Sequence, residues 1–377
     1  MNKPVGISAI AVNFPENVRT NDYWKSNYPE FIAQLEQKSQ TVRLFDNDER
    51  ENYNWAQAVK PYREDIFRGT CERRILGESE TSFNLELGAI EKVLQAAKLE
   101  INDVDLLISC AMFPENLAIG NATYLARDLG FRGAAWNLNA NCGGSLLALD
   151  NAAALISCKK FKRVLVSLSC NYSRHIEYTN SFSFTVGDGA AAFIVEEVEK
   201  GQGLVHSYAT NTYDTCDVVY PRLALDRNGK VRAFITINKD AVKDVTSLLI
   251  KYLQQCSQQV LLESQIAASD IDFFIFYPPA AGYVDFCAKE LNVPQEKTID
   301  IFPMYANISV VSAIVALHHA AALGKIKKND LVMVYSHGFS GSSAASIMRW
   351  GDVALGPAPA PSANLIRQSV RALADVR

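Results

Sequence analysis

Short apolar runs alternate along the chain with stretches whose apolar residues recur every three or four positions. Val104–Cys110 is mostly apolar, as in a buried strand, whereas residues 82–97 have the spacing of an amphipathic helix. Similar runs predict strands at Ile7–Val12, Ala134–Ala140, Arg163–Leu168, Ala190–Val195, Ile271–Phe276, Leu331–Tyr335 and Ser343–Arg349. Further helices are predicted at 121–129, 145–157, 241–262, 283–291 and 310–323. This alternation predicts an α/β protein with a mostly parallel sheet and helices on both faces.

The succession of strands and helices repeats loosely, which predicts two related halves joined near residue 200. We assign the N-terminal half to residues 1–200 and the C-terminal half to residues 201–350. Residues 21–63 are rich in charged and aromatic residues and in glutamine, so they are predicted to form a helical insertion in the first half. The insertion either covers a substrate tunnel or decorates the surface. Residues 351–377 are predicted to form a stiff proline-rich linker and a short amphipathic tail.

Composition and charge exclude several classes of function. Of the 377 residues, 49% are hydrophobic and 21% are charged, as in an ordinary globular protein, and the net charge is -4. Such a chain has no global basic field to bind nucleic acid or an anionic membrane. It shows no signal peptide and no apolar run of about 20 residues, so we expect a cytoplasmic protein. The eight cysteines occur singly, without metal-ligand spacing, so no metal site is predicted.

One short motif is a candidate for chemistry. Cys142 precedes Gly143 and Gly144 and lies between a predicted strand and a predicted helix. The unpaired N–H groups and the macrodipole at a helix N-terminus favour a thiolate, and paired glycines permit a tight turn and close approach by a ligand. A cysteine in this place can carry an acyl group as a thioester. The alternative is a small residue packed under the helix.

The segment around this cysteine, Asn139–Leu149, resembles the active-site segment of ketoacyl-ACP synthase III and its relatives in the thiolase superfamily. Phe184–Ala192 is similar to the same family's turn of glycine, aspartate, glycine and alanine. Shorter resemblances lie in the family's order at Cys71–Ile75, Asn228–Lys230, Ile271–Ile275, Tyr305–Ser309 and Met348–Trp350. The resemblance extends from about residue 5 to residue 350 and is interrupted by the insertion.

The resemblance implies a thiolase-like fold, in which two related βαβαβαββ halves form five layers in the order α-β-α-β-α. It implies an acyltransferase that takes an acyl group from acyl-CoA or from the phosphopantetheine of an acyl carrier protein, with no permanently bound cofactor. It also implies a homodimer. In the family an arginine usually meets the phosphate of the pantetheine arm. The candidates here are Arg68, Arg73 and Arg74, with surface solvation as the alternative role.

The sequence departs from the family where relatives decarboxylate an extender unit. Ketosynthases of this type use a histidine and an asparagine to stabilise the enolate that forms when carbon dioxide leaves. The asparagine corresponds to Asn307, but the histidine position holds Tyr277, or Pro278 if the alignment shifts by one residue. A phenol can donate one hydrogen bond, but its ordinary pKa near ~10 makes it a poor proton shuttle at neutral pH.

His337 is the candidate for the missing base. It opens a loop similar to the family's glycine-rich loop, which provides a second oxyanion N–H, so the resemblance implies an oxyanion hole at Cys142 and Phe339. Relatives usually carry phenylalanine at the position of His337, and an imidazole there could act as a base. The alternative is a loop histidine that bonds to the backbone.

Three functions remain. The first is acyl transfer through Cys142 to an acceptor of specialised metabolism, such as an alcohol, an amine or an acidic 1,3-dicarbonyl carbon. It is favoured because the family histidine is replaced while Cys142 and Asn307 remain. The second is a decarboxylative ketoacyl-ACP synthase III that uses a malonyl thioester and holds the enolate with Tyr277 and Asn307. The third is a catalytically silent partner of a related ketosynthase.

Overall fold

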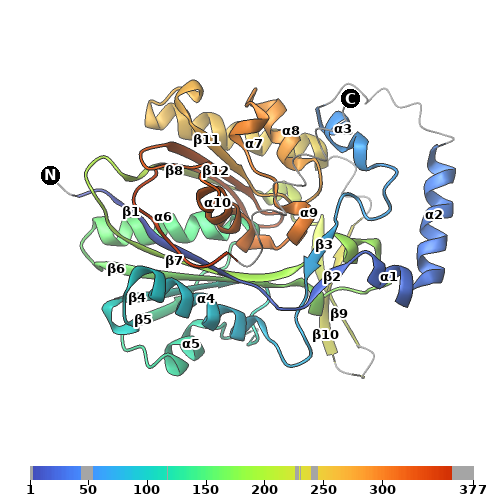
Figure 1. The fold of residues 1–377 in the computed structure, drawn as a ribbon, viewed down its shortest axis with the longest axis horizontal. Helices are drawn as coiled ribbons and strands as arrows, with labels where there is room; N and C mark the ends of the chain where they lie inside the picture. The colour runs from blue at the N-terminus through green and yellow to red at the C-terminus, as the bar shows by residue number, and fades with distance from the viewer. Residues whose placement is uncertain are drawn as a thin grey trace.

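The computed structural model describes residues 3–43, 54–116, 118–225, 229, 231–238 and 245–358. The larger of its sheets has six strands, in the order β14 (Ala354–Leu355), β1 (Val5–Asn13), β7 (Asp188–Glu197), β6 (Arg163–Asn171), β4 (Leu106–Ala111) and β5 (Ala134–Asn137). Except for β14, which adds to its edge, this sheet is built from the N-terminal part of the chain (Figure 1).

A four-stranded sheet from the C-terminal part repeats the same arrangement. Its strands are β11 (Phe273–Phe276), β12 (Leu331–His337), β13 (Ser342–Arg349) and β8 (Gly203–Asn211). In the six-stranded sheet, β7 pairs antiparallel with both β1 and β6. In the four-stranded sheet, β13 pairs antiparallel with both β8 and β12 in the same way. β6 is parallel to its other neighbour, β4, and β12 is parallel to its other neighbour, β11. The same topology occurs twice, which confirms the predicted fold class.

The sheets are mixed, which corrects the expectation of a mostly parallel arrangement. β12 and β13 are joined by residues 338–341 alone, and this connection is too short for a helical crossover. Between β6 and β7, residues 172–187 form only short 3-10 turns. Consecutive strands without a crossover helix run antiparallel, so the last two strands of each half reverse direction.

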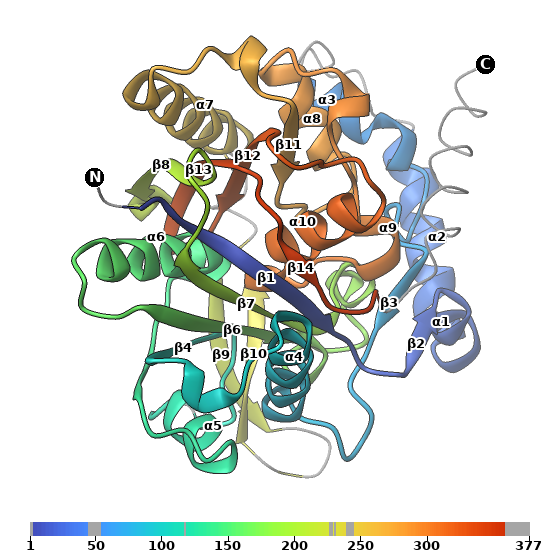
Figure 2. The same cartoon turned by 60° about the vertical axis from the view of Figure 1, so that its left-hand side comes forward.

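The elements stack in five layers (Figures 1 and 2). In order, the layers are α4 (Ser82–Ala97) with α5 (Ala122–Asp128), the six-stranded sheet, α6 (Gly144–Ser157) with α10 (Ser312–Ala322), the four-stranded sheet, and α7 (Val245–Ser264) with α8 (Tyr283–Glu290). α6 contacts both sheets, and α10 contacts β1 on one side and β11 and β12 on the other. A helix enclosed in this way is apolar all round, which explains the leucine and alanine content of these two.

The insertion contributes helices α1 (Asp22–Asn27), α2 (Pro29–Arg43) and α3 (Asn54–Val59), while its residues 44–53 lie outside the described part. α1 and α2 lie side by side at one edge of the molecule (Figure 2). α3 instead packs on α8 of the C-terminal half.

The insertion is anchored by an aromatic cluster. Trp24 on α1 is fully buried, its ring lies edge-on to Phe184 at 5.3 Å between centroids, and its Nε1 donates to Ser183 Oγ at 3.1 Å. Phe67 also packs on Phe184, at 4.9 Å between centroids. This part of the insertion is therefore attached to the loop that precedes β7.

The remaining named elements are β2 (Val18–Thr20), which pairs with β3 (Glu72–Arg74), the ribbon of β9 (Val219–Leu225) and β10 (Val231–Ile237), and the short α9 (Phe302–Tyr305). Asn228 and Lys230 of the family resemblance, and residues 359–377 of the predicted linker and tail, lie outside the described residues. No described helix is both long enough and apolar enough to span a membrane.

Candidate active site

Cys142 lies in a 3-10 turn, Asn141–Gly143, between β5 and the start of α6. Both following glycines are required, since a Cβ on Gly143 would stand 2.2 Å from the Ser342 carbonyl oxygen and one on Gly144 would stand 2.5 Å from Cys110 Sγ. The cysteine therefore occupies the predicted place at a helix N-terminus.

The turn is clamped to the loop between β12 and β13. Asn141 has a φ of +50°, and its Nδ2 donates to the carbonyl oxygens of Phe339 at 2.8 Å and Ser340 at 2.9 Å. Ser336 Oγ donates to the Cys142 carbonyl at 2.7 Å. The Cys142 turn is thus positioned by elements that belong to both large sheets.

Polar groups surround the sulfur. Ser309 Oγ lies 3.2 Å from Cys142 Sγ, and Tyr277 Oη lies 3.1 Å from it. Cys142 is only 7% exposed, and burial raises the pKa of its thiol. The neighbouring hydrogen bonds lower this pKa, but by less than burial raises it. The resting group at neutral pH is therefore a thiol, and the helix N-terminus does not by itself produce the expected thiolate.

Asn307 faces the same centre. Its Oδ1 accepts from Tyr277 Oη at 2.9 Å and from the Ser309 backbone N–H at 2.8 Å. Because a backbone N–H can only donate, the atom facing Ser309 is the amide oxygen, and the Nδ2 group points to the opposite side. The Asn307 backbone is held by Thr185 O and by Gly187 N–H, at 2.9 and 3.0 Å. The amide nitrogen is thus fixed as a donor.

Tyr277 stands at the end of β11, as the sequence predicts, and its N–H donates to Tyr335 O at 3.0 Å. The side chain is 2% exposed, and burial raises the pKa of its phenol well above 10. Tyr277 is therefore a neutral hydroxyl that touches both Cys142 and Asn307, and the structure brings these three predicted residues together.

His337 is not placed to act as their base, which corrects the prediction. Side chains alternate along β12, and Ser336 is directed to Cys142 while Tyr335 packs with the cluster under α7 and α8. His337 lies on the same face as Tyr335, with its ring 5.6 Å from Tyr252 of α7 and its Nδ1 2.6 Å from Ser343 Oγ. Burial lowers the pKa of His337 to about 3. The imidazole is separated from the sulfur by its own strand.

The glycine-rich loop does adjoin the nucleophile turn. A Cβ on Gly338 would lie 3.2 Å from the Gly143 nitrogen, and the Gly338 N–H donates to Ser342 O at 3.1 Å. Phe339 is half-buried, and its ring lies 4.7 Å from that of His337. The oxyanion role of the Cys142 and Phe339 N–H groups stays a prediction.

The three candidate arginines differ in their surroundings. Arg73 is fully buried, its Nε donates to Phe184 O at 3.1 Å, and its guanidinium lies 4.5 Å from the ring of Trp24. Burial lowers its pKa to about 9. Arg73 therefore holds the insertion and is not accessible to a phosphate, which corrects its assignment. Arg68 is exposed and Arg74 is half-buried, so both stay candidates.

One residue at the sulfur, Ser309, was not predicted. Ser309 lies two residues after Asn307, in the same family-like segment. This short spacing could have indicated that Ser309 also lies near Cys142. The Asp188 of the family-like turn is structural, because its carboxylate accepts from the backbone N–H groups of Leu76 at 2.8 Å and Ser173 at 2.9 Å.

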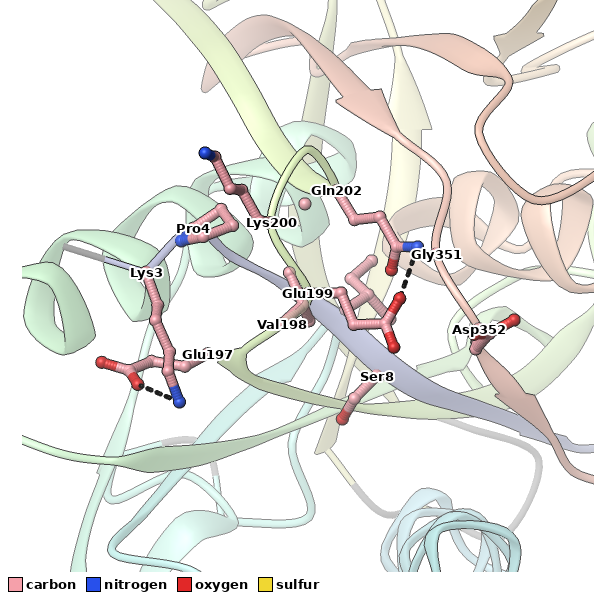
Figure 3. Close-up of a pocket in the computed structure, with 12 residues that line it drawn as sticks. Lys3, Pro4, Ser8, Glu197, Val198, Glu199, Lys200, Gln202, Gly351 and Asp352 are labelled. Carbon is pink, nitrogen blue, oxygen red and sulfur yellow. Dashed lines mark hydrogen bonds and ion pairs between the residues drawn. The ribbon is translucent and has the colours of Figure 1, made fainter. Parts of the chain in front are cut away.

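A pocket of about 640 Å³ opens elsewhere, beside the beginning of β1 (Figure 3). Lys3 and Glu197 in its wall form an ion pair of 3.8 Å, and Glu199 accepts from Gln202 at 3.2 Å. This pocket shares no residue with the centre around Cys142, so the chemistry is assigned to the latter.

Comparison with known proteins agrees with this geometry. Residues 136–213 match the family model 3-oxoacyl-[acyl-carrier-protein (ACP)] synthase III, and residues 261–350 match the model of its C terminal part. Beta-ketoacyl-[acyl-carrier-protein] synthase III of Rickettsia canadensis is 28% identical over 284 residues, which cover 75% of this chain and 88% of that protein. The enzyme of the same name from Brucella suis is 29% identical over 294 residues, with the same coverage of both chains.

Solved structures show the same fold. Synthase III of Thermus thermophilus superposes with a TM-score of 0.74 at 23% identity, covering 92% of this chain and 99% of that one. OleA of Xanthomonas campestris, crystallised with lauric acid and lauroyl-CoA, superposes with a TM-score of 0.71 at 16% identity, covering 93% and 100%. Together these findings show that the chain is similar in sequence to ketoacyl-ACP synthase III enzymes and shares their fold, and they indicate an acyltransferase of the condensing-enzyme type.

Proposed function

We propose that the protein transfers an acyl group from an acyl-CoA or acyl-ACP thioester, through a thioester on Cys142, to an acceptor of specialised metabolism. The observation that carries this proposal is the double contact of the Tyr277 hydroxyl, 3.1 Å from Cys142 Sγ and 2.9 Å from Asn307 Oδ1. In decarboxylating relatives, a histidine at this position directs a donor to the carbonyl of the extender unit. Here the hydroxyl at this position is turned to the sulfur and to the amide.

The contact weakens the case for decarboxylation in two ways. The phenol has one proton to donate, and its two partners are already protein atoms. Of Tyr277 and Asn307, only the Asn307 amide would then donate to the enolate. Removing one donor from an oxyanion site typically slows a reaction 10²–10³-fold, which corresponds to about 2.7–4 kcal/mol. An acceptor that is already nucleophilic, such as an alcohol, an amine or an acidic 1,3-dicarbonyl carbon, does not require that stabilisation.

The alternative of a silent partner subunit is supported less well. A cysteine kept only for packing would face apolar atoms, whereas Cys142 Sγ lies 3.2 Å from Ser309 Oγ and 3.1 Å from Tyr277 Oη. Such a polar environment suits an atom whose charge changes during a reaction.

The carriers follow the family. We propose acyl-CoA or an acyl carrier protein as donor, with Arg68 and Arg74 as candidate contacts for the pantetheine phosphate and no permanently bound cofactor. We also propose a cytoplasmic homodimer. The OleA structure with lauroyl-CoA supports including long acyl-CoA donors among the substrates to be tested.

Intact-mass spectrometry tests the proposal. The purified protein is mixed with acyl-CoA and acyl-ACP donors of short, medium and long chains, and Cys142→Ala is the matched control. We expect a mass increase of one acyl group that the control lacks. The absence of an increase, or an increase in the control as well, would favour the silent subunit. Incubation with malonyl-ACP should release little carbon dioxide, and rapid release would favour the decarboxylative enzyme.

A further inference from the structure

The loop between β12 and β13, residues 338–341, contains the Phe339 N–H that is predicted to serve the oxyanion hole. Almost every polar group of its backbone has a partner. The Gly338 N–H donates to Ser342 O at 3.1 Å, and Asn141 binds two of the loop's carbonyl oxygens. Two threonines bind the remaining groups, with one exception. Within the described part of the chain, only the Phe339 N–H among the loop's N–H groups lacks a hydrogen-bond partner.

The two threonines are Thr212 and Thr215, which we call the threonine clamp. Thr212 follows β8, and both residues are fully buried. The Thr212 hydroxyl donates to Gly338 O at 2.6 Å and accepts from the Gly341 N–H at 3.1 Å, while its backbone N–H donates to Gly341 O at 3.0 Å. The Thr215 hydroxyl accepts from the Ser340 N–H at 2.9 Å and donates to Thr212 O at 2.7 Å. Each hydroxyl thus donates once and accepts once, which fixes the direction of every bond in the clamp.

The loop has a backbone conformation that its own sequence does not favour. Ser340 has a φ of +51°, in the left-handed region that serine seldom adopts. Such a conformation persists where neighbouring contacts impose it. Here the Ser340 N–H is bound by Thr215, and the Ser340 hydroxyl donates to Cys216 O at 2.9 Å, just after the clamp. The clamp and the residue that follows it therefore determine the shape of the loop.

We propose that Thr212 and Thr215 are positioning residues, which hold the loop so that the Phe339 N–H is its donor for the oxygen of a thioester at Cys142. The inference deepens the proposed function and rests on it for the acyl chemistry. Oxyanion donors are effective because they are fixed in place before charge develops, so no energy is spent on moving them during the reaction. The clamp fixes this donor by binding the groups on either side of it.

The role is confined to steps that place charge on oxygen. When Cys142 Sγ attacks an acyl carbon, the sulfur–carbon bond forms and one electron pair of the carbonyl bond settles on oxygen. The pair returns as the leaving group departs, and the Cys142 proton ends on the leaving group or in solvent. Alkylation by iodoacetamide forms a sulfur–carbon bond as the carbon–iodine bond breaks, so iodide leaves, the proton passes to solvent and no oxyanion forms. Comparing an acylating with an alkylating reagent therefore isolates stabilisation of the oxyanion.

The experiment compares p-nitrophenyl acetate with iodoacetamide. Both rates at Cys142 are followed by peptide mass spectrometry, which separates this cysteine from the other seven. Thr212→Val keeps the branched shape and removes the hydroxyl, so Gly338 O and the Gly341 N–H lose their shared partner. Acetylation should slow about 10²-fold, the lower limit for loss of one oxyanion donor, while alkylation changes less than about threefold. Thr212→Ser restores the hydroxyl and should recover acetylation to within about threefold of the wild type.

Thr298→Val is the matched control, because Thr298 is a buried threonine whose hydroxyl donates to Gln295 O at 3.1 Å, away from the loop. Both of its rates should equal those of the wild type. If Thr212→Val does not fold, Thr215→Val takes its place and should slow acetylation about tenfold, as for one lost hydrogen bond. The proposal is overturned by equal slowing with both reagents, by unchanged acetylation, by no recovery in Thr212→Ser, or by a wild type that is not acetylated at Cys142.

The outcomes separate this inference from the proposed function. Acetylation that depends on Thr212, without any adduct from acyl-CoA or acyl-ACP, would retain the clamp and reject the acyltransferase. Adducts from those donors, with acetylation that is indifferent to Thr212, would reject the clamp and retain the acyltransferase.

Discussion

Replacing Tyr277 with histidine should convert the site to the arrangement of decarboxylating relatives. The phenol oxygen stands between Cys142 Sγ and Asn307 Oδ1, at 3.1 and 2.9 Å. An imidazole is shorter than a phenol, so it leaves that space open to a thioester carbonyl and places an N–H donor beside Asn307. The added donor should restore about 2.7–4 kcal/mol of enolate stabilisation, which corresponds to a 10²–10³-fold faster loss of carbon dioxide.

The assay is the release of labelled carbon dioxide from malonyl-ACP, with acetyl-ACP followed by mass spectrometry. Tyr277→Phe is the matched control, because it removes the hydroxyl without adding a donor, and it should show no gain. Adding Asn307→Ala to the histidine variant should abolish the gain. If the wild type already decarboxylates as fast as a folded, acylatable Tyr277→His variant, the reasoning from the hydroxyl's position is refuted.

Three further predictions concern the residues that support the site. Burial raises the pKa of Asp188 from 3.8 to about 6, so its contribution to stability is complete below pH 3.8 and is lost as the pH rises through about 6. Urea unfolding at pH ~4 and pH ~7 should show a loss of about 2 kcal/mol in the wild type that is missing in Asp188→Asn, and parallel pH dependence in the two would contradict this. Trp24→Ala should lower the free energy of unfolding by about 3–5 kcal/mol, because it removes the buried ring. Trp24→Phe should lower it by roughly 1 kcal/mol, because it loses only the hydrogen bond to Ser183. Equal losses in denaturant unfolding would argue against the role of Trp24 in anchoring the insertion. His337→Gln should change acyl loading and transfer by less than about threefold, and a loss of ~10²-fold or more in transfer alone would reinstate it as the base.

The local pattern along the chain was sufficient to predict most of the elements and the position of Cys142 before a helix. The predicted strand Val104–Cys110 overlaps β4, and Ile271–Phe276 contains β11, because a run of apolar residues between turns has few alternatives to a buried strand. Cys142 precedes a helix as predicted, and the two glycines after it are explained by contacts with Ser342 and Cys110 that only the folded chain reveals. Strand direction was predicted less well, since it depends on whether a connection contains a helix.

Side-chain direction separated the predicted site residues that lie together from those that do not. Tyr277 and Asn307 face the sulfur, as their motifs indicated. His337 is adjacent in sequence to Ser336, which bonds to the Cys142 carbonyl, but neighbouring residues on a strand point to opposite faces, so the imidazole lies in the outer layer. Arg73 matched a phosphate-binding segment, yet it is buried against Trp24.

The sequence by itself determined the α/β class, the cysteine, and the tyrosine in place of a histidine, because each depends on residue identity and short-range spacing. Tertiary structure alone decided which hydroxyl groups surround the sulfur and which charged side chains remain exposed. A hydrogen bond requires approach to about 3 Å, and Tyr277 and Ser309 reach that distance from the sulfur only when the two sheets and the helices between them pack together.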